Sequence, residues 1–243
     1  MLEPILQQLN SKRIVLASSS PRRRQILGNI NLKFETAKSN FEENLDKGTF
    51  SCPLDYVRET AKQKTLEVVD RLFSLEPSPD LIIGADTIVT NGKSIFEKPS
   101  SKDHAIEMIT RLNKMACCDL DYFYLLLGYA AKNSFCGRSH KVLTSVVLVT
   151  PKSSDMFKGR ISLNARLDIT QFEEESEVSM PNLTEDIIKS YVNTGESMDK
   201  AGGYGIQAVG GSLVSGIHGD YFNVMGFPLH RFCVELRNIC ILR

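Results

Sequence analysis

The stretch from Ile14 to Leu27 (IVLASSSPRRRQIL) constrains the fold of this chain more than any other. Its first three residues, Ile14 to Leu16, are β-branched or aliphatic, which is typical of a strand covered on both faces. Three serines follow where the chain must turn, and Ser20 occupies the position of a helix N-cap. Pro21 suits the first helical position because it lacks the N–H that would have no partner there. The pattern predicts a buried strand, a serine turn and a helix.

Three arginines, Arg22 to Arg24, fall in the first turn of that helix. The positive end of the helix dipole normally favours acidic residues at this position. Three cations there are unfavourable unless an anion binds, and a phosphate group is the obvious candidate. The alternative is a common strand–turn–helix whose basic residues face solvent.

Length, charge and composition limit the kinds of protein that this chain can be. The 243 residues suffice for one α/β domain or two small ones with a large core. Lysine plus arginine and aspartate plus glutamate both number 29, so no overall charge favours nucleic acid or a membrane as a partner. The first residues do not follow a signal-peptide pattern, and the apolar run 122–131 is too short to span a bilayer. We therefore expect a soluble, cytoplasmic protein.

The six cysteines lack the paired CxxC spacing of a zinc site. Several lie in apolar runs, so we expect reduced and buried thiols rather than disulfides.

Asp86 stands out because it lies in the middle of an apolar, β-branched segment, 81–90 (LIIGADTIVT). Asn91-Gly92 and a second short apolar run follow, and this pattern predicts a β-hairpin. A carboxylate is costly to bury without a partner, so it is usually paired or bound to a metal. Lys98, at the far end of the hairpin, is one candidate partner, and a purely structural ion pair is the alternative to a functional site.

Hydrophobic periodicity and turn signals predict the remaining elements. We expect helices at 1–10, 53–72, 101–113, 184–191 and from Pro228 onward, strands at 32–36, 140–149 and 161–177, an acidic loop at 39–50, a glycine-rich loop at 195–211 and a hairpin-like segment at 212–226. The mixture predicts an α/β fold, in two lobes with a cleft between them.

Together these features suggest a site that cleaves a phosphate anhydride. Such a reaction needs positive charge around the phosphate oxygens, a divalent metal held by carboxylates, and an oriented water. The helix start at 18–23, Asp86, Glu43, Lys64 and Lys98 could supply the protein's part. Magnesium suits so sparse a set of carboxylates, because it also binds the substrate's own phosphates. The sequence contains no GxxxxGK[ST] phosphate-binding loop.

Four motifs, in order, resemble the Maf family of nucleoside triphosphate pyrophosphatases: SSSPRR at 18–23, IGADTIV at 83–89, FEKP at 96–99 and DKAGGYGIQ at 199–207. The resemblance covers nearly the whole chain. It implies a fold related to the inosine triphosphate pyrophosphatases, in which a long, bent mixed sheet divides two lobes around a central cleft. It also implies a homodimer and hydrolysis between the α and β phosphates, dependent on Mg²⁺ or Mn²⁺, that clears unwanted nucleotides.

The resemblance also assigns roles to individual residues. Asp86 matches the catalytic base, and Asp86 and Glu43 match the metal ligands, although Glu42 remains an alternative to Glu43. The positions that mark the subgroup acting on dTTP and UTP are Arg22, Thr87 and Gln207. Those that match phosphate-binding residues are Ser18, Ser20, Arg23, Lys64, Lys98 and Lys200.

Physical chemistry agrees with these roles. A metal and lysines beside Asp86 would keep it ionised and able to accept a proton from water. Thr87 and Gln207 can both donate and accept hydrogen bonds, which suits the edge of a pyrimidine. Recognition of this kind rejects analogues strongly. The alternative for Gln207 is that it merely fills the glycine-rich loop.

One segment departs from the family pattern. About two dozen residues, roughly 114–136, stand where a loop of ~4–6 residues is usual. They could form an insertion in a lobe, a contact between subunits, or sequence translated across a wrong splice junction. We expect no catalytic role for them, because the segment is apolar with few polar groups.

Two other functions remain open at this point. One is a nucleotide-binding regulator of cell division with little turnover, which would need the phosphate loop but no base. The other is a pyrophosphatase for purines such as ITP.

Overall fold

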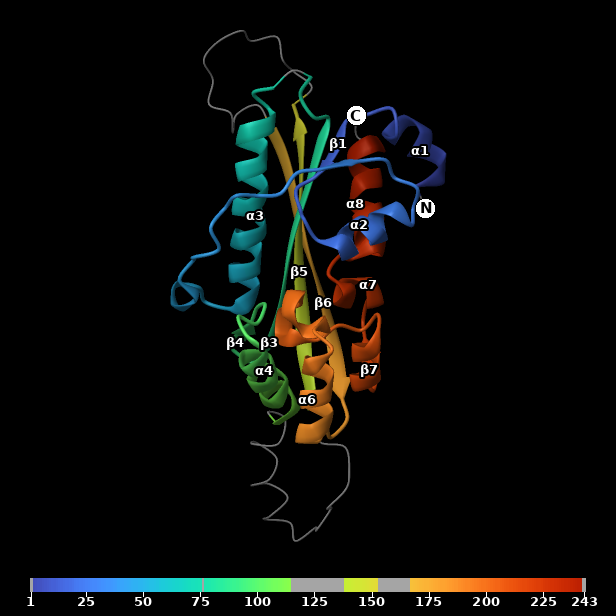
Figure 1. The fold of residues 1–243 in the computed structure, drawn as a ribbon. Coiled ribbons are helices and arrows are strands. Elements are labelled where there is room, and N and C mark those ends of the chain that lie inside the picture. Colours follow the sequence, from blue (N-terminus) through green and yellow to red (C-terminus); the bar gives the residue numbers. More distant parts are fainter. Residues whose placement is uncertain (1, 76, 115–137, 153–166, 242–243) are drawn as a thin grey trace, which may run out of the picture. The chain divides into compact units, whose positions relative to one another are not determined.

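The computed structural model describes residues 2–75, 77–114, 138–152 and 167–241, drawn in colour in Figure 1. The helices are α1 (Glu3–Leu9), α2 (Pro21–Gly28), α3 (Pro53–Leu72), α4 (Lys102–Lys114), α6 (Glu185–Asn193), α7 (Tyr221–Met225) and α8 (Leu229–Ile241). The strands are β1 (Ile14–Leu16), β2 (Glu35–Thr36), β3 (Leu81–Asn91), β4 (Ser94–Phe96), β5 (Arg138–Pro151), β6 (Leu167–Met180) and β7 (Gly216–His218). Short 3₁₀ turns lie at Lys47–Thr49, Glu196–Asp199, Ala201–Gly203 and Val209–Leu213.

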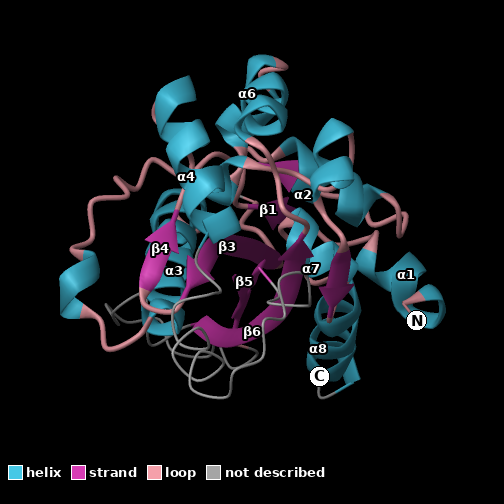
Figure 2. Cartoon of the chain, turned by 90° about the horizontal axis from the view of Figure 1, so that it is seen from below, coloured by secondary structure: helices cyan, strands magenta, loops and turns pink. Residues whose placement is uncertain are grey.

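The strands form one seven-stranded mixed sheet in the order β2-β1-β3-β5-β6-β7, with β4 paired to β3. β1 is parallel to both β2 and β3, whereas the pairs β3–β4 and β6–β7 are antiparallel. Figure 2 colours these strands magenta and the helices cyan. The predicted α/β fold with a mixed sheet is therefore confirmed.

The described chain divides into two compact units, and β3, β5 and β6 each contribute residues to both. The first unit comprises residues 1–86, 144–174 and 226–243, and the second comprises 87–143 and 175–225.

In the first unit, α3 packs on the sheet. Ala61, Val68 and Val69 of α3 share a buried cluster with Val15 of β1 and Ile82 of β3. The whole of β1 is buried, as its apolar sequence predicted. In Figure 1, α2 and α8 lie on the other side of these strands from α3. Burial on both faces explains why β1 reads as an unbroken apolar run.

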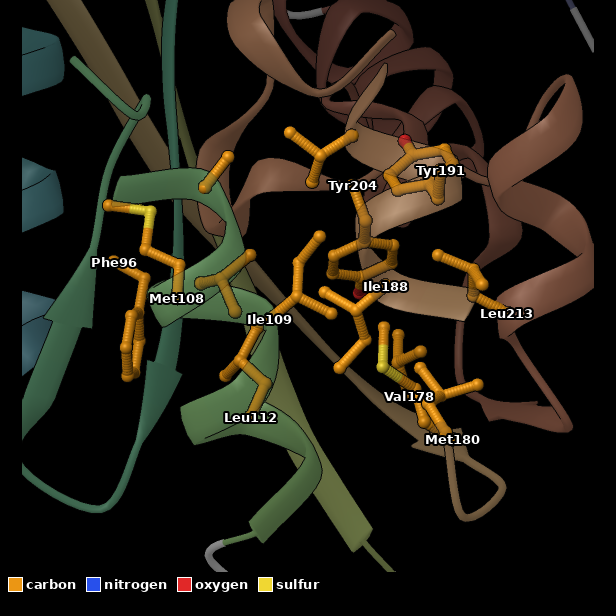
Figure 3. Close-up of a cluster of buried hydrophobic side chains, with 14 of the residues drawn as sticks. Phe96, Met108, Ile109, Leu112, Val178, Met180, Ile188, Tyr191, Tyr204 and Leu213 are labelled. Atoms are coloured by element: carbon orange, nitrogen blue, oxygen red, sulfur yellow. The ribbon is translucent and has the colours of Figure 1, made fainter. Parts of the chain in front are cut away.

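In the second unit, α4 and α6 pack together over a larger apolar cluster (Figure 3). Met108, Ile109 and Leu112 of α4 meet Ile188 and Tyr191 of α6 there. Their spacing of three and four residues places them on one face of each helix. The glycine-rich loop described below packs against this cluster.

Two of the predicted elements differ from the structure. Segment 212–226 is not a hairpin, because Gly216–His218 pairs with β6 and Tyr221–Met225 is helical. The carboxylate of Asp220 accepts a hydrogen bond from the N–H of Phe222 at 2.8 Å, which starts the helix. The strand predicted at 32–36 is only Glu35–Thr36.

Among the described cysteines, the predicted burial holds only in part. Cys52, Cys233 and Cys240 are free thiols; Cys233 is buried, Cys240 is half-buried and Cys52 is exposed. Cys117, Cys118 and Cys136 lie outside the described residues, as does almost all of the predicted insertion at 114–136. Within the described ranges, no helix is both long and apolar enough to cross a membrane.

Candidate active site

The serine turn begins the site, and its geometry follows the sequence prediction. The hydroxyl of Ser20 caps α2 by accepting a hydrogen bond from the N–H of Arg23 at 3.4 Å, with Pro21 as the first helical residue. The hydroxyl of Ser18 accepts a hydrogen bond from the N–H of Ser20 at 3.2 Å. The two serines therefore fix the shape of the turn that leads into the three arginines.

Arg23 is buried and donates hydrogen bonds to protein oxygens. Its Nε donates to the carbonyl of Gly226 at 2.9 Å, and its Nη1 donates to the carbonyl of Ala85 at 2.7 Å and to Ser18 Oγ at 3.3 Å. Burial lowers the pKa of this guanidinium, although the charge of Asp86 opposes the shift. Arg23 thus ties the helix start to the strand residue that precedes Asp86. Of its neighbours in the helical turn, Arg22 is half-buried and Arg24 is exposed.

Asp86 is buried on β3, and the partner that the structure gives it is Lys64 of α3. The Lys64 ammonium lies 2.9 Å from Asp86 Oδ1 and 2.8 Å from Glu43 Oε1. The carboxylate of Asp86 is 10% exposed, and that of Glu43 is 46% exposed. One ammonium group therefore bridges a buried carboxylate and an exposed one. Lys98, the candidate partner that the hairpin pattern suggests, is an exposed residue.

Burial raises the pKa of Asp86, and the positive charges of Lys64 and Arg23 oppose this shift without cancelling it. Burial also acts to lower the pKa of Lys64, but attraction to Asp86 and the hydrogen bond to Glu43 outweigh it and raise that pKa. Lys64 therefore stays protonated, while Asp86 holds a proton more readily than an ordinary carboxyl. A raised carboxyl pKa is the property expected of a general base.

A close approach of α3 to β3 brings Lys64 and Asp86 together. A Cβ atom on Gly84 would lie only 1.7 Å from the hydroxyl oxygen of Thr65. Only glycine permits this approach, so the helix comes near enough for Lys64 to meet a carboxylate two residues along the strand. The glycine of the GADT sequence thus has a packing role that sequence reasoning missed. Its signal was a glycine inside a strand pattern, which often marks a close approach of another segment.

The carboxylates of Glu43 and Asp86 provide two oxygen-bearing groups that suit a divalent cation. An oxygen of each already lies within hydrogen-bonding distance of one positive centre, the Lys64 ammonium. Two carboxylates and substrate phosphates are a set that Mg²⁺ accepts. Glu42, the alternative ligand, and Glu43 are both exposed, and Glu43 is the one that makes the contact with Lys64. Among the described residues, no group of three or more His, Cys, Asp or Glu side chains is placed to hold a metal ion.

Four predicted site residues belong to the second unit. Thr87 follows Asp86 on β3 and is half-buried, while Lys98 and Gln207 are exposed. The ammonium of Lys200 donates to the carbonyl of Glu196 and lies 2.7 Å from Asp199 Oδ1, so it already contacts two protein oxygens. In the first unit, Arg23 bonds to Ser18, and Lys64 bonds to Glu43 and Asp86; the charges of Arg23 and Asp86 also influence each other.

Comparison with known proteins identifies the class. The family model described as Maf-like protein matches residues 13–117 and 130–239. The chain therefore belongs to the Maf family, as the four sequence motifs indicated.

Individual relatives carry a consistent description. A human protein named probable bifunctional dTTP/UTP pyrophosphatase/methyltransferase is 45% identical over 97% of this chain. The dTTP/UTP pyrophosphatases of Schizosaccharomyces pombe and of a Clostridium perfringens strain are each 34% identical, over 92% and 93% of the chain. This chain spans only 33% of the human protein but 82% and 96% of the other two.

The solved structures found are distant. A HAM1 protein from Coxiella burnetii has a TM-score of 0.38 at 12% identity, with 93% of this chain and 99% of that chain covered. A likeness this weak carries no information on function.

Proposed function

We propose that this chain is a nucleoside triphosphate pyrophosphatase that hydrolyses dTTP and UTP to the monophosphate and pyrophosphate. The observation that carries the proposal is the buried carboxylate of Asp86, held 2.9 Å from the Lys64 ammonium within the family's GADT motif. The names of the relatives support the reaction and the pyrimidine substrates.

In the proposed reaction, Asp86 is the general base. A water attacks a phosphorus of the α–β bridge, its proton passes to a carboxylate oxygen of Asp86, and the bond from phosphorus to the bridging oxygen breaks. The electron pair of that bond leaves with the departing phosphate group. The raised pKa of Asp86 supports this role, because a base works best when its pKa lies near the operating pH.

Glu43 and Asp86 are the residues that would hold the proposed Mg²⁺ or Mn²⁺. Such an ion, when bound, supplies positive charge to the phosphate oxygens and helps to generate the nucleophile. Lys64, whose ammonium lies 2.8 Å from Glu43 and 2.9 Å from Asp86, would add its positive charge to this end of the site and could contact a substrate phosphate.

The residues proposed to bind phosphate divide into two groups. Ser18, Ser20 and Arg23 shape the turn and place a fixed positive charge beside Asp86, which stabilises negative charge developing during bond cleavage. Lys98 and Lys200 are further proposed phosphate contacts. Arg22, Thr87 and Gln207 are the proposed determinants of the base that is accepted.

A nucleotide panel tests the proposal. Purified protein with Mg²⁺ or Mn²⁺ should release pyrophosphate from UTP and dTTP faster than from ITP, and Asp86→Asn should lower that rate by about a thousandfold, within the usual range for losing a general base. Glu107→Gln, an exposed residue of α4 with no proposed role in the site, is the control and should keep the rate. Tight UTP binding without pyrophosphate release would contradict the proposal and favour the nucleotide-binding regulator. Preference for ITP would favour the purine enzyme.

The same assay addresses the proposed insertion and dimer. We expect a chain lacking 114–136 to keep its catalytic residues and its turnover. A light-scattering mass measurement on both chains would show whether the protein is a homodimer and whether the segment contributes to the contact.

A further inference from the structure

Glu196 forms an unusual set of contacts at the base of the glycine-rich loop. Its carboxylate accepts hydrogen bonds from the backbone N–H groups of Val209 at 3.1 Å and Gly210 at 3.3 Å. The hydroxyl of Tyr191 lies 3.5 Å from the same carboxylate and accepts a hydrogen bond from the N–H of Gly205 at 3.1 Å. One side-chain pair thus binds three backbone N–H groups of a single loop.

These three N–H groups flank Gln207. Gly205 precedes it by two residues, and Val209 and Gly210 follow it by two and three. The ends of the loop approach so closely that a Cβ atom on Gly210 would lie 2.1 Å from the carbonyl oxygen of Gly205 and 2.8 Å from the Tyr191 hydroxyl. Gln207 and Ala208 are exposed between these ends. The geometry is a tight loop closed at its base, with Gln207 at its tip.

The pair that closes the loop is itself firmly anchored. Tyr191 lies on α6, and its ring is buried in the apolar cluster with Ile188 and Leu213 (Figure 3). Glu196 follows three residues after the end of α6, and its carbonyl also accepts a hydrogen bond from Lys200. The loop is therefore anchored to the core of the second unit.

We propose that Glu196 and Tyr191 are positioning residues for substrate selection, because they hold the loop that presents Gln207 to the base of the nucleotide. This inference rests on the proposed function and deepens it. The sequence motif places Gln207 at the recognition position, but a long polar side chain on an exposed loop selects a base only if the backbone beneath it is fixed. Pre-organisation of this kind lowers the ordering cost that binding would otherwise incur.

The carboxylate of Glu196 suits this task better than an amide would. Both of its oxygens accept hydrogen bonds, Oε2 from Val209 and Oε1 from Gly210. A glutamine would direct an NH₂ group toward one of those N–H donors, since an amide carries only one oxygen. Glu196→Gln keeps the size of the side chain and removes one of the three acceptors that close the loop.

The test compares UTP with ITP as substrates of the full chain. For Tyr191→Phe and for Glu196→Gln we expect KM for UTP to rise while kcat changes little, and the ratio of kcat/KM for UTP over ITP to fall by about tenfold, as when a hydrogen bond used for discrimination is weakened. Glu185→Gln is the matched control: Glu185 lies on α6 with Tyr191, its carboxylate pairs with Lys189 at the surface, and its replacement should change neither value.

A double-mutant cycle with Gln207→Ala separates this inference from the proposed function. Once Gln207 is removed, adding Tyr191→Phe should cost little further discrimination, because the two residues act through one element. If Gln207→Ala leaves the UTP/ITP ratio unchanged, Gln207 does not select the base and the proposed function loses its specificity assignment. If Gln207→Ala lowers the ratio while folded Tyr191→Phe and Glu196→Gln keep it, the positioning role is wrong. Equal losses of kcat on UTP and ITP in these variants would also overturn it.

Discussion

Asp86 and Gln207 are held in place in opposite ways. Asp86 is a buried carboxylate on a strand, and charged side chains surround it: Lys64 at 2.9 Å and the guanidinium of Arg23 through the adjoining carbonyl of Ala85. Gln207 is exposed at a loop tip, and the loop is held by hydrogen bonds from its backbone to Glu196 and Tyr191. The residue proposed for chemistry depends on charge, and the residue proposed for recognition depends on backbone position.

This difference predicts distinct sensitivities. A group that must exchange a proton needs an environment that tunes its pKa, and burial beside cations supplies one. A group that must match the edge of a base needs a fixed location but no tuning. Changes of charge should therefore damage the first region through the pH dependence of the reaction, whereas the second should respond mainly in KM and substrate preference.

Removing the charge of Lys64 should have the largest effect. We expect Lys64→Met to lower kcat/KM for UTP by about a thousandfold, the upper end of the loss on removing one electrostatic contact. The pKa of Asp86 should also rise further, because Lys64 opposes the shift that burial causes. The acidic limb of the kcat/KM profile against pH should then move to higher pH. Lys62→Met on the same helix is the control, and an unmoved limb in Lys64→Met would contradict the charge coupling.

The second prediction concerns a neutral contact in the second unit. His140 Nε2 lies 2.5 Å from the hydroxyl of Tyr204, and burial lowers the pKa of His140 to about 4. The unfolded chain takes up a proton near pH 6.5 that the folded chain does not. The contribution of His140 to the free energy of unfolding should therefore be fully present above pH 6.5. It should fall by about 3 kcal/mol as the pH drops to 4.

Urea unfolding at pH 7, 5.5 and 4.5 measures that loss. His140→Gln should lack this part of the pH dependence, and the exposed His230→Gln should retain it. The raised pKa of Asp86 acts in the opposite direction, since its stabilising contribution is present at low pH and is lost as pH rises, but it is common to all three proteins. Parallel curves for wild type and His140→Gln would show that the buried pair is not neutral.

The third prediction has the smallest expected effect and tests packing beneath the charged region. Gly84→Ala forces its new Cβ against Thr65 and should destabilise the fold by about 1–3 kcal/mol, as overpacking does. Displacement of α3 should also weaken the Lys64–Asp86 pair and lower kcat. Adding Thr65→Ala should restore part of both, since it removes the hydroxyl that lies closest.

Gly28→Ala is the matched control for unfolding and turnover, because a Cβ there meets nothing within 4 Å. If Gly84→Ala were as stable and active as this control, the close approach would not be what brings Lys64 to Asp86.

The local elements were largely predictable because their signals lie within a few residues of one another. Pro21 and Pro53 each begin a helix, Ser20 caps the first, and Asn91-Gly92 joins β3 to β4, as the sequence indicated. The segment 212–226 was misread because its short strand pairs with β6, more than thirty residues earlier in the chain. A three-residue strand has little periodicity of its own, so its pairing decides its structure.

The sequence by itself determined the family, the element order and the importance of Asp86, since a carboxylate in an apolar strand is costly wherever the chain goes. Only the tertiary structure decided which cation meets it. Lys64 is 22 residues from Asp86, and it arrives because Gly84 lets Thr65 pack against β3. The tertiary structure likewise turned Arg23 inward onto backbone carbonyls and closed the loop of Gln207 on Glu196 and Tyr191. These contacts depend on distances across the fold, and no spacing along the chain encodes them.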